Sequence, residues 1–271
     1  MEGIVKTFLE ENEVKSGWQK LILQSNDLTQ KLGEIIQILP FPYYYTPQKK
    51  KILNAFSHAE PGDIKVVIIG TSPAPDKSIA NGLAFSSDGY EQKFFHLAAI
   101  PKVHNALRDA NILRHDKKDY CCGHQQWAEN GVLLLNAALT ITEGNGDAKD
   151  IEKHCNIWRE FLQDMLCEWI TPINDKLFVM RWGYAKPGKV NYAESVWSKA
   201  HELVKDKLNV HTFKLIHHPT YPRAKEDNNF SSEATKHFKE INTDYNNIFD
   251  IPVTPDDSDS LTSSLSKLEL K

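Results

Sequence analysis

Four short apolar runs, separated by longer amphipathic stretches, constrain the fold of this chain more than any other feature. They span residues 64–70, 132–136, 177–182 and 211–216. Apolar runs of this length without polar alternation are typical of strands that are buried on both faces of a parallel sheet. Helical periodicity lies between them, most clearly over residues 151–170. The alternation predicts an α/β domain with a central four-stranded parallel sheet flanked by helices.

Further helical patterns lie on both sides of these runs. Residues 192–206 and 231–247 are periodic, and Ser231 is the expected N-cap of the second. Residues 4–36 are also periodic and contain no proline. The prolines of residues 39–47 forbid a helix, so we expect an extended segment there.

These patterns divide the chain into three parts. The last part is rich in Pro, Asp, Ser and Thr and poor in apolar residues, which is typical of a disordered tail. We expect an N-terminal helical extension packed on the domain at residues 1–36, the α/β domain at 37–250 and the tail at 251–271.

Charge and hydropathy limit the partners and the location of the protein. The formal net charge is -4 and the isoelectric point is about 6.3, whereas a bulk nucleic-acid binder is usually basic, so any DNA contact must come from a local patch. No apolar run approaches the roughly 20 residues that span a bilayer. The N-terminus lacks the basic-then-apolar pattern of a secretory signal. We therefore expect a monomer inside the cell, in the nucleus or the cytoplasm.

The cysteines give no sign of a metal centre. Cys121 and Cys122 are adjacent, Cys155 and Cys167 are isolated, and no C-x-x-C pair exists. This spacing disfavours zinc and iron–sulfur ligation. We expect reduced thiols, no metal and no cofactor.

The residues at the ends of the four runs point to a site. Ligands of parallel sheets bind beyond the carboxyl ends of the strands. Those ends read Gly70-Thr71-Ser72-Pro73, Asn136, Trp182-Gly183 and His217-His218-Pro219. The sequence therefore predicts that these residues converge at one edge of the sheet.

At these positions the chain resembles the uracil-DNA glycosylase superfamily of the ung-like type. Residues 70–86 align without a gap with the family's water-activating loop, G-Q-D-P-Y-H-G-P-G-Q-A-H-G-L-A/C-F-S. Residues 131–140, 182–186 and 218–223 resemble, in the same order, G-V-L-L-L-N-A-V-L-T, W-G-S-Y-A-Q and H-P-S-P-L-S. Singly, such residues are more typical of core or turn positions, but their joint order is specific. The resemblance covers about residues 15–250 and implies the uracil-DNA glycosylase fold, with a pocket for a flipped-out pyrimidine.

The resemblance also implies roles for individual residues. Phe85 would stack on the extruded base, and Asn136 would pair with its polar edge. His218 would donate to the carbonyl oxygen that gains charge as the glycosidic bond breaks. The remaining expected base-binding residues are Thr71 and Ala74, and the expected DNA contacts are Lys102, Tyr184, Tyr221, Pro222 and Arg223.

The departures from the family pattern lie in the chemistry. Ser72 stands where the family has the Asp that orients the attacking water, and a hydroxyl is neither charged nor basic near pH 7. Losing a positioned general base typically costs about 10²–10⁴-fold in rate. Asp76 is four residues further on, and we do not expect its carboxylate to reach back. Ala74 replaces the Tyr that excludes thymine, and Pro222 replaces the intercalating Leu.

Two functions remain open at this stage. The first is a catalytically impaired or inactive homologue that binds DNA or a replication or repair protein. The alternative is an active, divergent glycosylase that hydrolyses the N-glycosidic bond of uracil or a 5-substituted pyrimidine in DNA. An interaction module that uses the acidic surface and the tail is a third class.

Overall fold

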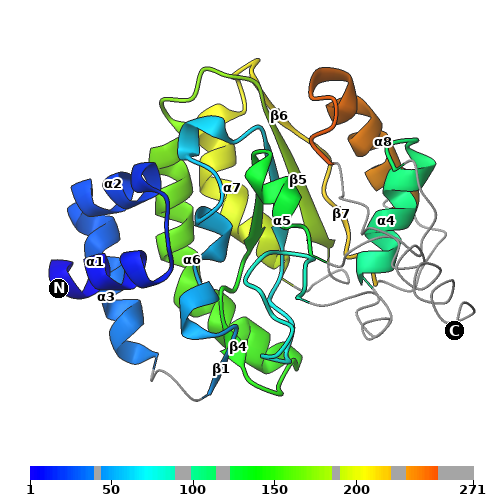
Figure 1. The fold of residues 1–271 in the computed structure, drawn as a ribbon. Helices are drawn as coiled ribbons and strands as arrows, with labels where there is room; N and C mark the ends of the chain where they lie inside the picture. The colour runs from blue at the N-terminus through cyan, green and yellow to red at the C-terminus, as the bar shows by residue number, and fades with distance from the viewer. Residues whose placement is uncertain (40–43, 89–98, 114–122, 185–189, 221–229, 250–271) are drawn as a thin grey trace, which may run out of the picture.

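The computed structural model centres on a parallel sheet (Figure 1). The strands are β2 (Val66–Gly70), β3 (Val132–Asn136), β5 (Leu177–Tyr184) and β6 (Val210–Thr212), in the order β3-β2-β5-β6, and β7 (Ile216–His217) pairs with β5. Every residue of β2 and β3 is buried. The predicted α/β fold with a central parallel sheet is confirmed. The residues that the structure describes are 1–39, 44–88, 99–113, 123–184, 190–220 and 230–249.

The fourth predicted strand is divided in two. Phe213 still donates its backbone N–H to the carbonyl of Val179 at 3.0 Å, but its own carbonyl accepts a hydrogen bond from Arg181 Nη2 at 2.7 Å. The Arg181 side chain therefore takes the acceptor that a continuing ladder would use. Pairing resumes at Trp182, which lies opposite Ile216 with an irregular register.

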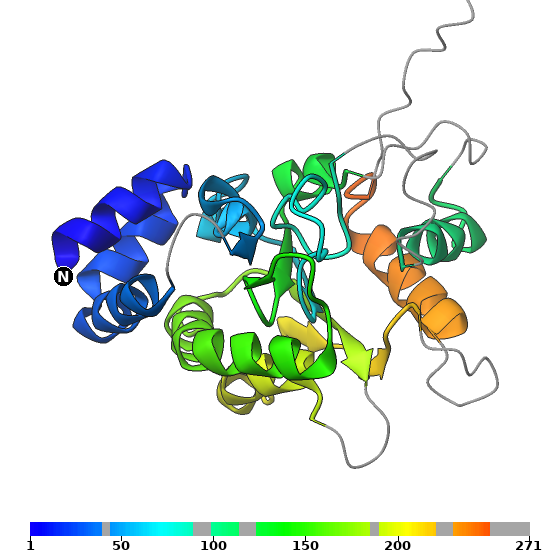
Figure 2. The ribbon, with the colours of Figure 1, turned by 90° about the horizontal axis from the view of Figure 1, so that it is seen from below.

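Helices cover both faces of the sheet. Along β5, Phe178 and Trp182 contact Tyr245 and Phe238, whereas Arg181 pairs with Glu194 on the other side. Because side chains alternate along a strand, the helices they meet lie on opposite faces. Figure 2 shows α6 (Ala148–Ile170) beside α7 (Tyr192–Val204), and α4 (Ala99–Asp109) beside α8 (Phe230–Asp244).

The structure corrects two helix starts. The helix predicted at 151–170 begins at Ala148, because Asp147 Oδ1 accepts the N–H groups of Lys149 and Asp150 at 2.9 and 2.8 Å. Ser231 is not an N-cap, since α8 begins at Phe230. The buried ring of Phe230 packs against Trp182, with ring centroids 5.0 Å apart. This apolar contact holds the first turn of α8 in place.

The N-terminal periodic region consists of three helices, α1 (Glu2–Glu11), α2 (Ser16–Gln24) and α3 (Asn26–Ile38). Glu13 has φ +53 between the first two, and the Ser25 hydroxyl accepts from the N–H of Leu28 at 3.3 Å at the start of the third. The ring of Trp18 on α2 lies 5.3 Å from the rings of both Phe56 and Trp169, measured between ring centroids. The helices thus pack against α6, but the division of the chain at residues 36 and 250 stays a prediction.

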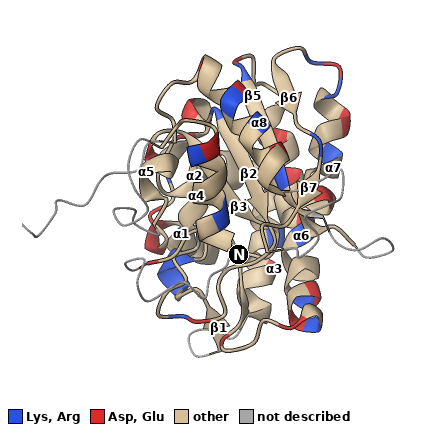
Figure 3. Ribbon diagram, turned by 90° about the vertical axis from the view of Figure 1, so that its right-hand side faces the viewer, with Lys and Arg blue, Asp and Glu red and all other residues tan. Residues whose placement is uncertain are grey.

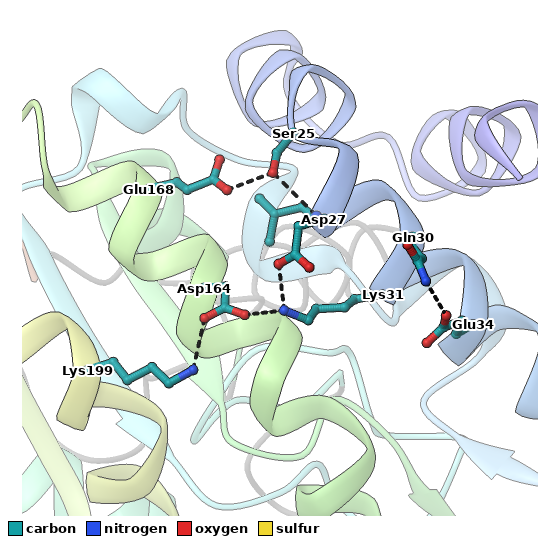
Figure 4. Close-up of polar contacts among 9 residues, drawn as sticks. Ser25, Asp27, Gln30, Lys31, Glu34, Asp164, Glu168 and Lys199 are labelled. Atoms are coloured by element: carbon teal, nitrogen blue, oxygen red, sulfur yellow. Dashed lines mark hydrogen bonds and ion pairs between the residues drawn. The ribbon is translucent and has the colours of Figure 1, made fainter.

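Polar contacts reinforce this packing (Figure 4). Lys31 Nζ lies 2.5 Å from Asp164 Oδ2 and 2.5 Å from Asp27 Oδ2. Asp164 Oδ1 also pairs with Lys199 of α7 at 3.1 Å. One carboxylate of α6 therefore links α3 to α7.

Short elements complete the described part. Part of the predicted extended segment forms β1 (Tyr45–Thr46), which pairs antiparallel with β4 (Ile141–Thr142). None of the helices that the structure describes has both the length and the apolar character of a membrane span. The remaining elements are α5 (Gln125–Glu129) and the 3₁₀ turns Lys49–Lys51, Asn54–Phe56 and Pro61–Asp63.

Candidate functional site

A pocket of about 270 Å³ lies at the carboxyl edge of the sheet. This is close to the lower end of the volumes that small-molecule sites occupy, about 300 Å³. Its walls come from the loop after β2, the end of β3, the first turn of α4 and the segment after β7. Six predicted site residues line it together: Thr71, Ser72, Ala74, Phe85, Asn136 and His218.

The register of the sheet brings these residues together. Gly70 lies opposite Asn136, so β2 and β3 end at the same level. A Cβ atom on residue 70 would lie 2.9 Å from Phe85 Cε2 and 3.0 Å from Asn136 Oδ1. The absence of a side chain at Gly70 therefore lets the aromatic ring and the amide meet over the strand end.

Phe85 forms an aromatic wall of the pocket. Its half-buried ring lies 5.0 Å from Trp182 and 5.5 Å from His218, measured between ring centroids. Such tilted arrangements are favourable for aromatic pairs. The ring can present a flat apolar surface to a planar ligand.

Asn136 supplies unused hydrogen-bonding capacity. The residue is only 2% exposed, yet its amide makes no hydrogen bond with any residue in the described part of the chain. Buried amides are usually satisfied. The side chain thus offers a donor and an acceptor to a pocket ligand.

His218 is a neutral donor. Its Nδ1 accepts the backbone N–H of Thr220 at 3.2 Å and lies 2.8 Å from Thr220 Oγ1. A neutral imidazole that accepts at Nδ1 carries its proton on Nε2. Burial, and then the charge of Lys102, lower the pKa of His218 to about 4. At neutral pH the residue can therefore donate a hydrogen bond from Nε2 without carrying a charge.

The pocket wall around Ser72 contains no carboxylate among the described lining residues. Asp76, the nearest acid in the loop, is exposed and accepts from the N–H and the hydroxyl of Ser78 at 2.8 and 2.7 Å. These bonds lower the pKa of the Asp76 carboxyl. Its contacts thus keep Asp76 in its own turn, as we expected.

The loop that carries Ser72 is held from outside the pocket. Thr46 Oγ1 donates to the carbonyl of Ala74 at 3.0 Å, and the N–H of Gly144 donates to the carbonyl of Pro75 at 2.9 Å. The β1–β4 pair therefore fixes the position of the wall at Ala74.

Curated proteins named uracil-DNA glycosylase are similar to this chain in sequence, although no family model matches it. A uracil-DNA glycosylase of Buchnera aphidicola is 31% identical over 140 residues, which is 51% of this chain and 58% of the relative. A uracil-DNA glycosylase of Vibrio cholerae is 28% identical over 179 residues, which is 64% of this chain and 68% of the relative. The chain thus spans about 58% of the length of the first relative.

Solved structures show the same fold. The UNG crystal structure from Nitratifractor salsuginis superposes with a TM-score of 0.59 at 19% identity, covering 88% of this chain and 96% of the other. The mimivirus uracil-DNA glycosylase superposes with a TM-score of 0.58 at 18% identity, covering 91% of this chain and 87% of the other. The chain is thus similar in sequence to uracil-DNA glycosylases, and it has the fold of the solved UNG structures.

The DNA contacts predicted from the glycosylase resemblance are only partly placed. Lys102 lies in the first turns of α4, close enough to His218 for its charge to act on the imidazole, and Tyr184 is the last residue of β5. Figure 3 shows basic and acidic positions interspersed along the helices. Residues 221–223, which include Tyr221, Pro222 and Arg223, lie outside the described residues.

Sequence reasoning missed several pocket residues. Ser86 directly follows Phe85, and Ala99 and Ile100 form the start of α4; all three line the pocket. Ser86 matches the glycosylase motif, which was the available signal. Of the start of α4, only Lys102 was predicted to lie near the site, as a DNA contact.

Proposed function

We propose that this chain is a uracil-DNA glycosylase-like protein that binds a pyrimidine base extruded from DNA and hydrolyses its glycosidic bond weakly or not at all. One observation carries the proposal. The pocket combines Phe85, Asn136 and a neutral His218, while none of its described lining residues is a carboxylate.

The three groups suit a planar base with carbonyl oxygens. The amide of Asn136, which has no hydrogen-bond partner among the described residues, can donate and accept at adjacent positions of the base edge. The Nε2–H of His218 can donate to a carbonyl oxygen, and the Phe85 ring can stack on the base face. A buried site of this kind recognises a base only after it leaves the duplex stack.

Hydrolysis needs more than recognition. As the glycosidic bond breaks, the base gains negative charge, which the His218 donor can stabilise. The sugar gains positive charge and a water must attack it, and both steps favour a nearby carboxylate. The Ser72 hydroxyl supplies neither charge nor basicity, so we expect turnover to be lower by about 10²–10⁴-fold than with a positioned base.

A base-release assay tests the proposal. The protein, in large excess over single-stranded DNA with one uracil, should bind the DNA and release uracil slowly or not at all, and Asn136→Ala should lose the base-dependent part of the binding. Rapid release of free uracil by the unmodified protein would contradict the impairment.

The second candidate is an active glycosylase with altered base choice. It is favoured by the neutral His218 donor and by the small side chain of Ala74 in a wall that Thr46 holds in place. Uracil, thymine and 5-hydroxymethyluracil substrates should then give product, and Ala74→Tyr should remove activity on the 5-substituted bases. Absence of product from all three would exclude this candidate.

Partners and location follow from the same proposal. DNA is the proposed partner, contacted by Lys102, Tyr184 and residues 221–223, and a replication or repair protein is the alternative. We propose a monomer that acts inside the cell, in the nucleus or the cytoplasm. Sedimentation with and without DNA tests the oligomeric state.

A further inference from the structure

The aromatic wall of the pocket depends on an unusual backbone conformation. Phe85 has φ +57, in the left-handed region where a Cβ atom crowds the following carbonyl oxygen. Such a conformation persists at a residue with a side chain only where the surroundings hold it. The contacts on either side of Phe85 therefore matter for the position of its ring.

Before Phe85 the chain is attached to the sheet. The N–H of Ala84 donates to the carbonyl of Leu134 on β3 at 3.0 Å. The N–H of Leu83 donates to Asn81 Oδ1 at 3.1 Å. These bonds fix the incoming chain.

Directly after Phe85 the hydroxyl of Ser86 attaches the chain to two other segments. Ser86 Oγ accepts from Asn81 Nδ2 at 2.8 Å and from the backbone N–H of His124 at 2.9 Å. All three residues are buried: Ser86 is 8%, Asn81 6% and His124 0% exposed. Although Ser86 borders the pocket, both acceptor lone pairs of its hydroxyl are thus occupied by protein donors.

The donor from His124 is itself fixed. The His124 ring stacks on Trp127, with centroids 4.0 Å apart and planes 14° apart, and its Nε2 lies 3.0 Å from His104 Nε2. The N–H group that Ser86 accepts therefore belongs to a fully buried residue whose ring packs against Trp127 and His104.

We infer that Ser86 is a positioning residue of the base pocket, whose hydroxyl joins Asn81 and His124 and so keeps Phe85 in its left-handed conformation with the ring facing the base. The inference rests on the proposed function, because the ring position matters only if a base stacks on it. Removing the hydroxyl leaves two buried donors without an acceptor, and the backbone then shifts to satisfy them. Phe85 leaves its strained conformation, and its ring leaves the site over Gly70.

The test compares two DNAs that differ only in the base. One carries a single 2′-fluoro-deoxyuridine, whose glycosidic bond resists cleavage, and the other carries an abasic site at the same position; affinities are measured by fluorescence anisotropy. Ser86→Ala should weaken binding of the first by about tenfold, a part of the stacking contribution, and leave binding of the second unchanged. A merely structural defect would weaken both equally.

Two further variants sharpen the comparison. Ser87→Ala removes the hydroxyl of the neighbouring residue, which is fully buried and has no hydrogen-bond partner within the described chain. Because this change leaves no donor without its acceptor, the variant should keep the base preference. Ser86→Thr keeps the hydroxyl and should restore the preference. If Ser86→Ala does not fold, Ser86→Cys, whose sulfur is a weak acceptor, should show an intermediate loss.

The outcomes separate the two levels of the proposal. Equal affinity of the unmodified protein for the two DNAs would refute base binding itself, and the role of Ser86 with it. A clear base preference that Ser86→Ala retains, or that Ser87→Ala loses equally, would refute the positioning role alone.

Discussion

Substituting Gly70 by alanine places a methyl group where the Phe85 ring and the Asn136 amide now meet. Its Cβ would lie 2.9 Å from Phe85 Cε2 and 3.0 Å from Asn136 Oδ1. The first distance is about 0.6 Å shorter than the ~3.5 Å contact distance between carbon atoms. Gly70 does not have a positive φ, so backbone strain does not contribute. Overpacking of this kind costs about 1–3 kcal/mol of stability.

The same displacement should impair base recognition. A ring moved by about 0.6 Å loses part of a stacking contribution of about 1–3 kcal/mol per base, so we expect about a tenfold rise in Kd for DNA with an extruded uracil analogue. Thermal unfolding and anisotropy measure the two effects on one sample. Gly62→Ala, where nothing lies within 4 Å of the new Cβ, is the matched control. Unchanged base preference in Gly70→Ala would refute the proposed site geometry.

Three more predictions follow from charges in the structure. Asp164→Asn removes the partner of Lys31 and Lys199 and should lower the free energy of unfolding in urea by about 1 kcal/mol. Burial lowers the pKa of His237 to about 4, so the unfolded state takes up the proton first; stability should fall as pH drops from about 6.5 to about 4, by up to ~3 kcal/mol, and His237→Phe should reduce that dependence. Because His218 is neutral above its pKa of about 4, base binding should be constant from about pH 6 to 8.

Matched variants control these measurements. Glu202→Gln breaks an exposed pair with Lys205 and should leave stability unchanged, so an equal loss would contradict the role of Asp164. His211→Phe, at a half-exposed side chain, should keep the acid dependence that His237→Phe reduces. A base affinity that titrates near pH 6.5 would refute a neutral His218.

Continuous apolar runs could be read from the sequence because their signal is local. Residues 132–136 were predicted to be a strand and form β3 with the same bounds, since continuous burial leaves a continuous apolar pattern. Where a distant side chain intervenes, the prediction was wrong. The run at 211–216 divides because Arg181, on another strand, takes the Phe213 carbonyl.

Helix starts show the same limit. Ser231 has the residue type of an N-cap, but the buried Phe230 belongs to the helix because Trp182 packs against it. The N-terminal region is periodic throughout, and only the left-handed Glu13 and the Ser25 cap divide it into three helices. Both outcomes depend on contacts or conformations that periodicity does not contain.

The sequence by itself determined the fold class of this protein and the main residues that meet at its site. The order of the strand ends places Ser72, Asn136 and His218 together, because parallel strands end at one edge. Only the tertiary structure decided their states: the proton on His218 Nε2, the Asn136 amide without a hydrogen bond among the described residues, and the contact of Ser86, next to Phe85, with His124, 38 residues away. Hydrogen bonds and burial join segments that are distant in the chain, and so no local pattern records them.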